Sequence, residues 1–269
     1  LAYDKDGATW FKGSSLGRDV DRVIIKSSGE PTYRLPDIAY HKDKYLRGYD
    51  LMIDVFGADH MDAYPDILVA LDALGHKSEK VKVLIHQFVT ILKDGKPVKM
   101  STRKANFISL DQLIDDVSAD VTRFFFIMRS MNTHLNFDID LAKEQSDANP
   151  VFYIQYAHAR CCNILNRFNE KLDSSTLDNL SNELEIQLIS KLIEFPETIK
   201  KSMVTLEPQN ISNYLNELAS MFHSYYAKER VFNPEDMNLS KARLYLVNST
   251  RIVIRNGLSI LGITSPEKM

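Results

Sequence analysis

The first hundred residues alternate short apolar runs with amphipathic stretches, a pattern that predicts strands and helices in turn. Two runs rich in β-branched residues, at 22–25 and 51–55, are expected to be buried strands. Apolar positions at helical spacing predict helices over residues 35–45 and 61–74, the second ended by Gly75. Because strands and helices alternate, we expect a parallel sheet with crossover helices.

The next segment combines a hairpin signal with helical periodicity. An apolar run leads into Asp94-Gly95, a dipeptide typical of a tight turn between two strands. From residue 109 to about 147 the apolar spacing is helical. Asn149-Pro150 then supplies an N-cap and a proline at the first helical position, so a long helix should begin here.

The remainder of the chain is predicted to be helical to its end. Amphipathic helices are expected over residues 184–203, 211–230 and 240–261, the first kinked at Phe195-Pro196. The predicted fold class is therefore α/β followed by all-α. The sheet part looks like the second half of a Rossmann-type nucleotide-binding domain, and the helical part is expected to be a bundle.

Three regions are predicted from this pattern: a sheet domain at 1–109, a helical connecting region at 110–148 and a helical domain at 149–269. With 269 residues, 44% of them hydrophobic, the chain can form a core in each domain. Since the sequence starts at Leu1 rather than methionine, we expect it to be a piece of a longer protein.

Composition narrows the possible partners and location. A formal net charge of -3 excludes a body coated in positive charge, although a local basic and aromatic stripe could still bind RNA. The only cysteines, Cys161 and Cys162, are neighbours that make a poor disulfide and cannot close a zinc site alone. No apolar run approaches the roughly 20 residues of a membrane span. We therefore expect a cytoplasmic protein without a membrane partner.

A basic loop follows the predicted hairpin and carries Lys99, Ser101, Arg103 and Lys104. Lysine and arginine can neutralise charge that develops on a polyphosphate, and a serine hydroxyl can donate to it, so the loop suits phosphoryl or nucleotidyl transfer. The alternative is a solvated basic hairpin without a ligand.

Polar residues also gather near predicted strand ends and at a helix start. Tyr33 and Asp37 could place a ring and a carboxylate on one side of a pocket, or Asp37 could cap the helix beside a half-buried tyrosine. Asp59 and His60 directly follow a strand, where α/β sheets bind ligands, or they simply cap a helix. His86, in the next strand, is interpreted as structural rather than as a nucleotide contact.

The helix after Asn149 shows two stripes. The inward stripe is predicted to contain Val151, Ile154, Cys161, Leu165 and Phe168. A second stripe, spaced three, four, three, four, contains Tyr153, Tyr156, Arg160, Asn163 and Arg167. Aromatic faces followed by guanidinium and amide groups can stack unpaired bases and neutralise phosphates. The alternative is ordinary packing of the tyrosines against a neighbouring helix.

Several of these segments match one family. Lys99-Met100-Ser101-Thr102-Arg103 resembles the Lys-Met-Ser-Lys-Ser loop of class I aminoacyl-tRNA synthetases, with Thr102 in place of the second lysine. Asp120-Val121-Thr122-Arg123 resembles the Asp-Ala-Leu-Arg element that names an anticodon-binding domain. Closer resemblance to arginyl-tRNA synthetases is found at residues 32–40, 57–60, 132–141, 152–160 and 256–269. In this comparison, residues 132–141 are interpreted as the linker between the sheet and helical domains.

The resemblance implies ATP-dependent activation of L-arginine and its transfer to tRNA-Arg by an arginine-tRNA ligase, with Mg²⁺ at the triphosphate. It places the catalytic signature at Lys99, Met100, Ser101, Thr102, Arg103 and Lys104. It assigns arginine binding to Tyr33, Asp37, Asp59 and His60, and ATP binding to Gly57, His86, Lys99, Ser101 and Lys104. It assigns tRNA binding to Tyr153, Tyr156, Arg160, Tyr226 and Met269.

Two rival interpretations stay open at this point. The family's His-Ile-Gly-His motif is absent, so the chain could be a tRNA-binding fragment without catalysis. A cysteinyl-tRNA synthetase has the same helical appendage, but its zinc needs cysteine and histidine ligands, and the only cysteines here lie in a helix of the other domain. We expect a monomer in either case.

Overall fold

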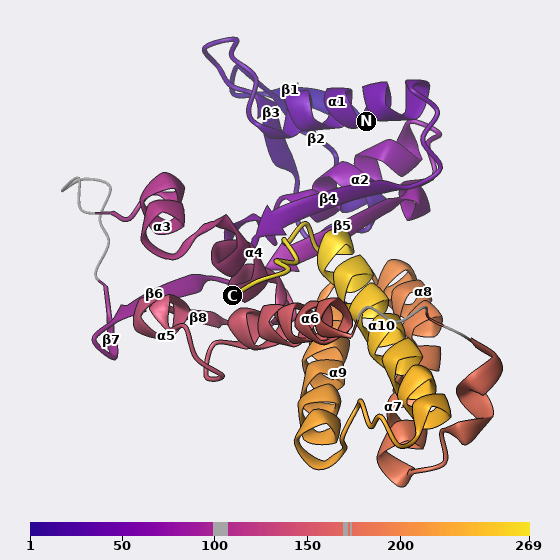
Figure 1. Cartoon of the computed structure of the whole chain (residues 1–269). Helices are drawn as coiled ribbons and strands as arrows, with labels where there is room; N and C mark the ends of the chain where they lie inside the picture. Colours follow the sequence, from indigo (N-terminus) through magenta and orange to yellow (C-terminus); the bar gives the residue numbers. More distant parts are fainter. Residues whose placement is uncertain (99–106, 169–171, 173) are drawn as a thin grey trace. The chain divides into compact units, whose positions relative to one another are not determined.

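The computed structural model describes residues 1–98, 107–168, 172 and 174–269 (Figure 1). These residues form two compact units. The first contains residues 1–88 and 131–134, and the second contains residues 89–130 and 135–269.

The first unit begins with an antiparallel sheet of β1 (Ala2–Lys5), β2 (Ala8–Phe11) and β3 (Arg22–Ile25). The predicted strand at 22–25 is confirmed, but its predicted partner is wrong, because β3 pairs with β2 rather than entering a parallel sheet. Pairing with a strand close in sequence closes a short loop and therefore costs less chain entropy than a crossover connection.

A parallel pair forms the rest of this unit, with β4 (Met52–Gly57) beside β5 (Val81–His86). The predicted helices are present as α1 (Arg34–Leu46) and α2 (Tyr64–Ala73). They pack with β4 and β5 around a core that includes Met52, Ile67, Leu71 and Val81. The expectation that residues 51–55 are wholly buried is wrong, because Met52 and Asp54 are buried whereas Ile53 and Val55 are 45% and 61% exposed.

The second unit contains the predicted hairpin. Strands β6 (Val89–Lys93) and β7 (Lys96–Pro97) are antiparallel, and Asp94 and Gly95 between them have φ of 53° and 68°. Two successive left-handed residues give a tight turn whose twist matches that of the strands, and a glycine accepts this conformation without steric cost. The hairpin prediction is therefore confirmed.

The segment interpreted as a linker has a different structure. Residues 135–138 form β8 (Leu135–Asp138), which is parallel to β6, and α5 (Ile139–Lys143) follows directly. Leu135 and Phe137 point to one face and are 3% and 0% exposed. The chain passes from the first unit to the second between His134 and Leu135, within the predicted linker. From Leu135 on, however, the segment is a strand and a helix packed in the second unit rather than a free connection.

Helices make up most of the second unit, as predicted. They are α3 (Leu110–Val117), α4 (Ala119–Ile127), α6 (Pro150–Arg167), α7 (Glu183–Ile193), α8 (Phe195–Thr205), α9 (Gln209–Lys228) and α10 (Met237–Ile260) (Figure 1). The single kinked helix expected at 184–203 is instead two helices, because Pro196 lies in the first turn of α8 and lacks the N–H that would continue α7.

The bundle core is formed mainly where α6, α9 and α10 pack against one another. Ile154, Leu215, Phe222 and Ile254 are fully buried there. A buried ion pair fastens α7 to α10, since Arg243 Nε lies 2.7 Å from Glu185 Oε1. These contacts fix the relative orientation of α6 and α9, which carry the aromatic and basic residues described next.

Candidate functional site

The start of α6 is set by its N-cap. The Asn149 side chain accepts hydrogen bonds from the backbone N–H groups of Val151 and Phe152, at 3.2 and 3.5 Å. Its amide also donates to the carbonyls of Ala142 and Glu144, at 3.1 and 2.9 Å. The cap is 2% exposed. Its hydrogen bonds begin the helix and connect it to the C-terminal end of α5.

The two predicted stripes of α6 are confirmed as an inward and an outward face. Val151, Ile154 and Cys161 are fully buried, with Leu165 and Phe168 half-buried beside them. On the second stripe, Tyr153 and Arg160 are half-buried, whereas Tyr156, Asn163 and Arg167 are exposed. We name the surface formed by Tyr153, Tyr156, Arg160, His223 and Tyr226 the aromatic–basic surface.

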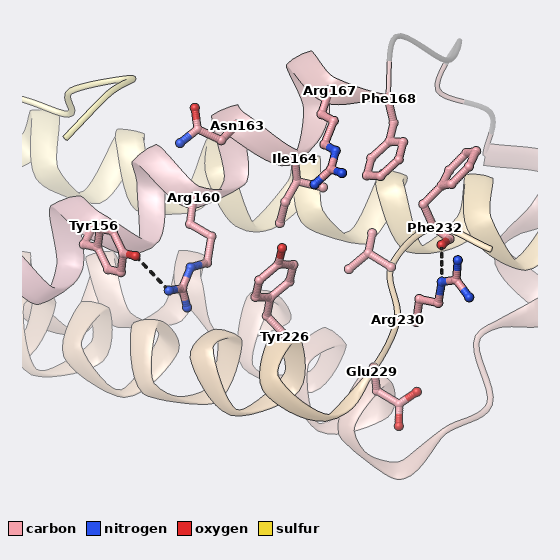
Figure 2. A pocket seen from close by; sticks show the side chains of 11 residues that line it. Tyr156, Arg160, Asn163, Ile164, Arg167, Phe168, Tyr226, Glu229, Arg230 and Phe232 are labelled. Carbon is pink, nitrogen blue, oxygen red and sulfur yellow. Dashed lines mark hydrogen bonds between the residues drawn. The ribbon is translucent and has the colours of Figure 1, made fainter. Parts of the chain in front are cut away.

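Arg160 is the centre of this surface. Its guanidinium carbon lies 4.6 Å from the ring centre of Tyr156 on α6 and 5.2 Å from that of Tyr226 on α9. Arg160 Nη2 donates to the Tyr156 hydroxyl at 3.0 Å, and Figure 2 shows the guanidinium between the two rings. The structure therefore brings together Tyr156, Arg160 and Tyr226, although Tyr226 lies far along the chain.

His223 completes this group, and the sequence analysis did not identify it. Arg160 Nη1 donates to His223 Nδ1 at 2.9 Å, so the ring proton lies on Nε2, which faces the carbonyl of Tyr153 at 3.4 Å. Its ring centre lies 4.7 Å from that of Tyr153. His223 and Tyr226 are three residues apart on α9, a spacing that places them on one helix face and could have indicated both.

The environment of His223 keeps it neutral. Burial lowers the pKa of His223, and the positive charge of Arg160 lowers it further, while the Tyr153 carbonyl acts in the opposite direction. A neutral imidazole accepts from Arg160, whereas an imidazolium would oppose it with a second donor. The guanidinium is therefore held by uncharged groups and keeps its charge available to a ligand.

A cavity of about 730 Å³ opens beside Arg160 and Tyr226 (Figure 2). Phe168 and Phe232 stack at one end with ring centres 4.2 Å apart. The remaining lining residues are Tyr156, Asn163, Ile164, Arg167, Glu229, Arg230 and Val231. Aromatic, amide and guanidinium groups thus line one concave surface.

The cavity carries an excess of positive charge. Its one carboxylate, on Glu229, is bound by Arg243 at 2.8 Å and by the Asn182 amide at 2.8 Å. Within the residues that the structure describes, Arg160, Arg167 and Arg230 form no ion pair with a carboxylate. These three guanidinium groups suit phosphate oxygens.

Met269, the remaining predicted tRNA contact, lies in a different place. It is 48% exposed and lines a second cavity, of about 540 Å³, together with Phe152 and Gln155 of α6. Met269 therefore lies beside the N-terminal half of α6 and does not line the cavity beside Tyr226.

The arginine-binding candidates Tyr33 and Asp37 are exposed in the first unit. Tyr33 is 92% exposed at the start of α1, and Asp37 lies in the first turn without capping it. The alternative of a capping aspartate beside a half-buried tyrosine is therefore wrong. A side-chain hydrogen bond fixes the Asp37 backbone, because His41 Nδ1 donates to the Asp37 carbonyl at 2.8 Å.

A buried pair anchors His41 to the sheet. His41 Nε2 lies 2.6 Å from Asp54 Oδ2, and Lys44 Nζ donates to Asp54 Oδ1 at 2.6 Å. Burial raises the pKa of Asp54, but hydrogen bonds from His41 and Lys44 outweigh this effect and the pKa is lowered. The carboxylate therefore fixes the second half of α1 on β4.

The nucleotide candidates lie at the carboxyl ends of β4 and β5. Gly57 and His86 are opposite each other in the parallel register. Asp59 and His60 are exposed in a short 3-10 helix (Ala58–His60), where the His60 ring stacks on Phe56 with centres 5.6 Å apart. An added Cβ at Gly57 would lie 2.6 Å from Asp59 Oδ1, so a larger residue here would require the exposed Asp59 side chain to move.

The catalytic-loop candidates Lys99, Met100, Ser101, Thr102, Arg103 and Lys104 lie outside the described residues. In the part of the chain that is described, there is no group of three or more histidine, cysteine, aspartate or glutamate residues that could hold a metal ion. None of the helices described there is long and apolar enough to cross a membrane.

Two family models together cover the whole chain. Residues 1–158 match the catalytic domain of class I tRNA synthetases, type R, and residues 154–269 match the DALR anticodon-binding domain. The chain belongs to the arginyl-tRNA synthetase family. The predicted boundaries at residues 109 and 148 stay predictions.

Curated members of the arginyl-tRNA synthetase family resemble the chain along its length. The arginine--tRNA ligase of Desulfotalea psychrophila is 50% identical over 100% of this chain and 50% of its own. That of Chlorobium limicola is 54% identical over 98% of this chain and 49% of its own. The chain thus spans about half the length of these relatives.

Solved structures of the arginyl-tRNA synthetase family have the same fold. A putative arginyl tRNA synthetase from Campylobacter jejuni superposes with a TM-score of 0.90 at 33% identity, over 100% of this chain and 59% of that one. The arginyl-tRNA synthetase of Thermus thermophilus has a TM-score of 0.82 at 21% identity, over 99% of this chain and 55% of that one. The second likeness concerns the fold alone.

Proposed function

We propose that the chain recognises the anticodon loop of tRNA-Arg through the aromatic–basic surface, as part of an arginine-tRNA ligase. The observation that carries this proposal is the placement of Arg160 between Tyr156 and Tyr226, next to a cavity with three guanidinium groups that lack carboxylate partners among the described residues. Exposed rings can stack on unpaired bases, and the guanidinium groups can bind phosphates.

The complete protein is proposed to activate L-arginine with ATP and to transfer it to tRNA-Arg, acting as a monomer in the cytoplasm. In this proposal the first unit is the second half of a Rossmann-type domain. Asp37 pairs with the arginine substrate, because a carboxylate is the natural partner of a guanidinium or α-amino group. Tyr33, Asp59 and His60 are proposed to line the same substrate site.

ATP is proposed to contact the edge of the sheet where β4 and β5 end. Gly57 and His86 face each other there, and ligands of open α/β sheets bind beyond the carboxyl ends of strands. Lys99, Ser101 and Lys104 are proposed to neutralise charge that develops on the triphosphate, with Met100, Thr102 and Arg103 completing the loop. Positioning and charge stabilisation would supply the rate enhancement.

Magnesium would accompany ATP rather than occupy a protein cage. Among the described residues no carboxylate cluster offers the several oxygen ligands that Mg²⁺ prefers. The described residues are proposed to bind and orient the substrates.

A second candidate function is a tRNA-binding module without catalysis. It is favoured by one observation, that the chain spans only about half the length of its curated relatives. The His-Ile-Gly-His motif is absent from the sequence. Both candidates share tRNA binding and differ in arginine activation.

Two measurements separate these candidates. Titration of the 269-residue chain with tRNA-Arg should show binding that weakens as salt rises. Exchange of pyrophosphate into ATP, with arginine and tRNA present, tests activation in the same preparation. Binding with exchange supports the ligase function in this chain, and binding without exchange supports the module. The absence of any tRNA binding would contradict both.

A further inference from the structure

The segment Asp120–Arg123, which resembles Asp-Ala-Leu-Arg, contacts the C-terminal end of the chain. The Asp120 carboxylate accepts from the backbone N–H of Thr264, at 3.2 Å to each oxygen, and also from the Thr264 hydroxyl. Gln155 of α6 joins the same group, since its amide donates to Asp120 Oδ2 at 2.9 Å and to the Thr264 carbonyl at 2.9 Å. A single carboxylate therefore holds both the tail and α6.

Contacts on either side of Thr264 fix the path of the tail. Gly262 has φ of 68° and packs against Arg123, whose side-chain atoms would lie 3.4 Å from an added Cβ. Ile263 is 4% exposed. Further on, His158 Nδ1 donates to the carbonyl of Pro266 at 2.9 Å. The tail is thus held at three successive points, at Gly262, Thr264 and Pro266.

This path ends beside the aromatic–basic surface. Met269 lines the same cavity as Phe152 and Gln155. Phe152 in turn stacks on Tyr156, with ring centres 6.3 Å apart and planes 13° from parallel. Phe152 also lines a hollow of about 320 Å³ together with Tyr153, Tyr156, Arg160 and His223. Phe152 is therefore shared between the tail cavity and the aromatic–basic surface.

We propose that Asp120, Gln155 and Thr264 are positioning residues for RNA binding, which hold the tail so that Met269 and Phe152 together extend the aromatic–basic surface. This inference rests on the proposed tRNA binding. The physical reason is preorganisation. An unanchored tail would lose conformational entropy when RNA binds, which weakens binding, whereas an anchored tail has already lost that entropy on folding. These three residues, named the tail clamp here, would therefore strengthen RNA binding without contacting the RNA.

A double-mutant cycle tests this role in the 269-residue chain. Asp120→Asn keeps the size of the side chain but removes its charge and one acceptor. The second change deletes residues 267–269. If the clamp acts through the tail, each change should weaken tRNA-Arg binding about tenfold, and Asp120→Asn should cost less than about twofold in the shortened chain, because coupled residues are non-additive.

Thr264 supplies a second set of variants that does not depend on the folding of Asp120→Asn. Thr264→Val removes the hydroxyl that donates to Asp120, whereas Thr264→Ser retains it. We expect Thr264→Val to weaken binding and Thr264→Ser to restore it, with equal melting temperatures. Asp115→Asn, an exposed carboxylate on α3, is the matched control and should bind as the unaltered chain does.

The outcomes are distinct. Loss of affinity that disappears in the shortened chain supports the positioning role. Additive losses, or full affinity of both Asp120→Asn and Thr264→Val, overturn it while leaving the proposed function intact. If the unaltered chain does not bind tRNA-Arg, the proposed function fails and this inference fails with it.

Discussion

At the scale of single residues, the neutral surroundings of the half-buried Arg160 distinguish it from the buried Arg243. Arg243 is neutralised by Glu185 and Glu229. Arg160 instead donates to a tyrosine hydroxyl and to a neutral histidine. A guanidinium that is oriented but not neutralised is prepared for an external phosphate, whereas a paired one is structural.

The ring of Tyr156 should matter more than its hydroxyl. Tyr156→Ala removes the stacking face and should cost about 1 to 3 kcal/mol of tRNA binding. Tyr156→Phe loses one exposed hydrogen bond to Arg160 and should cost less than about 1 kcal/mol. Dissociation constants from a tRNA titration check both values, with Tyr49→Ala, an exposed tyrosine of the first unit, as the control. Equal losses for Phe and Ala would contradict base stacking.

His223 should make folding stability sensitive to mild acid. Its folded-state pKa is lowered, so its contribution is fully present above its unfolded-state pKa and is lost as pH falls from there through the folded-state pKa. In His223→Gln, an amide oxygen can replace the acceptor for Arg160 without titrating. Urea unfolding between pH 7.5 and 5 should therefore show a smaller loss of stability in the variant. An identical pH dependence would refute this role of His223.

Asp37 should affect arginine more than ATP. In a full-length enzyme that contains this chain, Asp37→Asn removes one charge from a substrate ion pair and should raise the KM for arginine by roughly 30-fold or more. The KM for ATP should change little. Steady-state aminoacylation kinetics measure both, and Asp43→Asn, an exposed carboxylate on the same helix, is the control. Equal changes for the two substrates would exclude Asp37 from the arginine site.

At the scale of elements, α6 combines structural and functional roles in one helix. Its first turns carry Phe152, Tyr153 and Tyr156, and its cap is made by Asn149 alone. The inward face packs on α9 and α10, so the direction of the outward face follows from the bundle core. The geometry of the aromatic–basic surface therefore depends on how α6 begins.

Asn149→Ala should test this dependence. The change removes the acceptor for two backbone N–H groups and leaves the carbonyls of Ala142 and Glu144, the first of them buried, without their donor. Together these losses should cost about 1 to 3 kcal/mol of unfolding free energy. Urea denaturation measures it. Ser109→Ala removes the N-cap acceptor of α3, away from the stripe, and should affect tRNA binding less. A variant as stable as the unaltered chain would contradict the cap assignment.

At the scale of the whole molecule, the distribution of charge matters more than its sum. The chain has a net charge of -3, yet the cavity beside Tyr226 contains three guanidinium groups. Polyanion binding depends on the local phosphate contacts and on the counterions that they release, so an acidic protein can bind RNA at one surface.

The salt dependence of tRNA binding should report how many of these arginines contact phosphates. Arg167→Ala or Arg230→Ala should each weaken tRNA binding and reduce the slope of log K against log salt concentration by about 1. Titrations at several salt concentrations measure the slope. Lys200→Ala, an exposed cation on α8, should leave the slope unchanged. Equal slopes for all variants would mean that these arginines do not contact phosphates.

The sequence by itself determined the features that adjacent residues encode. Asp94 and Gly95 adopt the left-handed conformation that aspartate tolerates and glycine accepts without steric cost. Asn149-Pro150 begins α6 as predicted. The two stripes of α6 follow from residue spacing on a single helix. Motif resemblance also identified the family that the comparisons confirm.

Only the tertiary structure decided which distant residues meet. It placed β3 beside β2, inserted β8 beside β6, brought His223 to Arg160 across 63 positions, and joined Asp120 to Thr264 across 144. Periodicity shows which face of an element is buried but does not specify the partner that covers it. Those partners are selected by packing among whole elements, and a contact between them is stabilising only when the complete core has assembled.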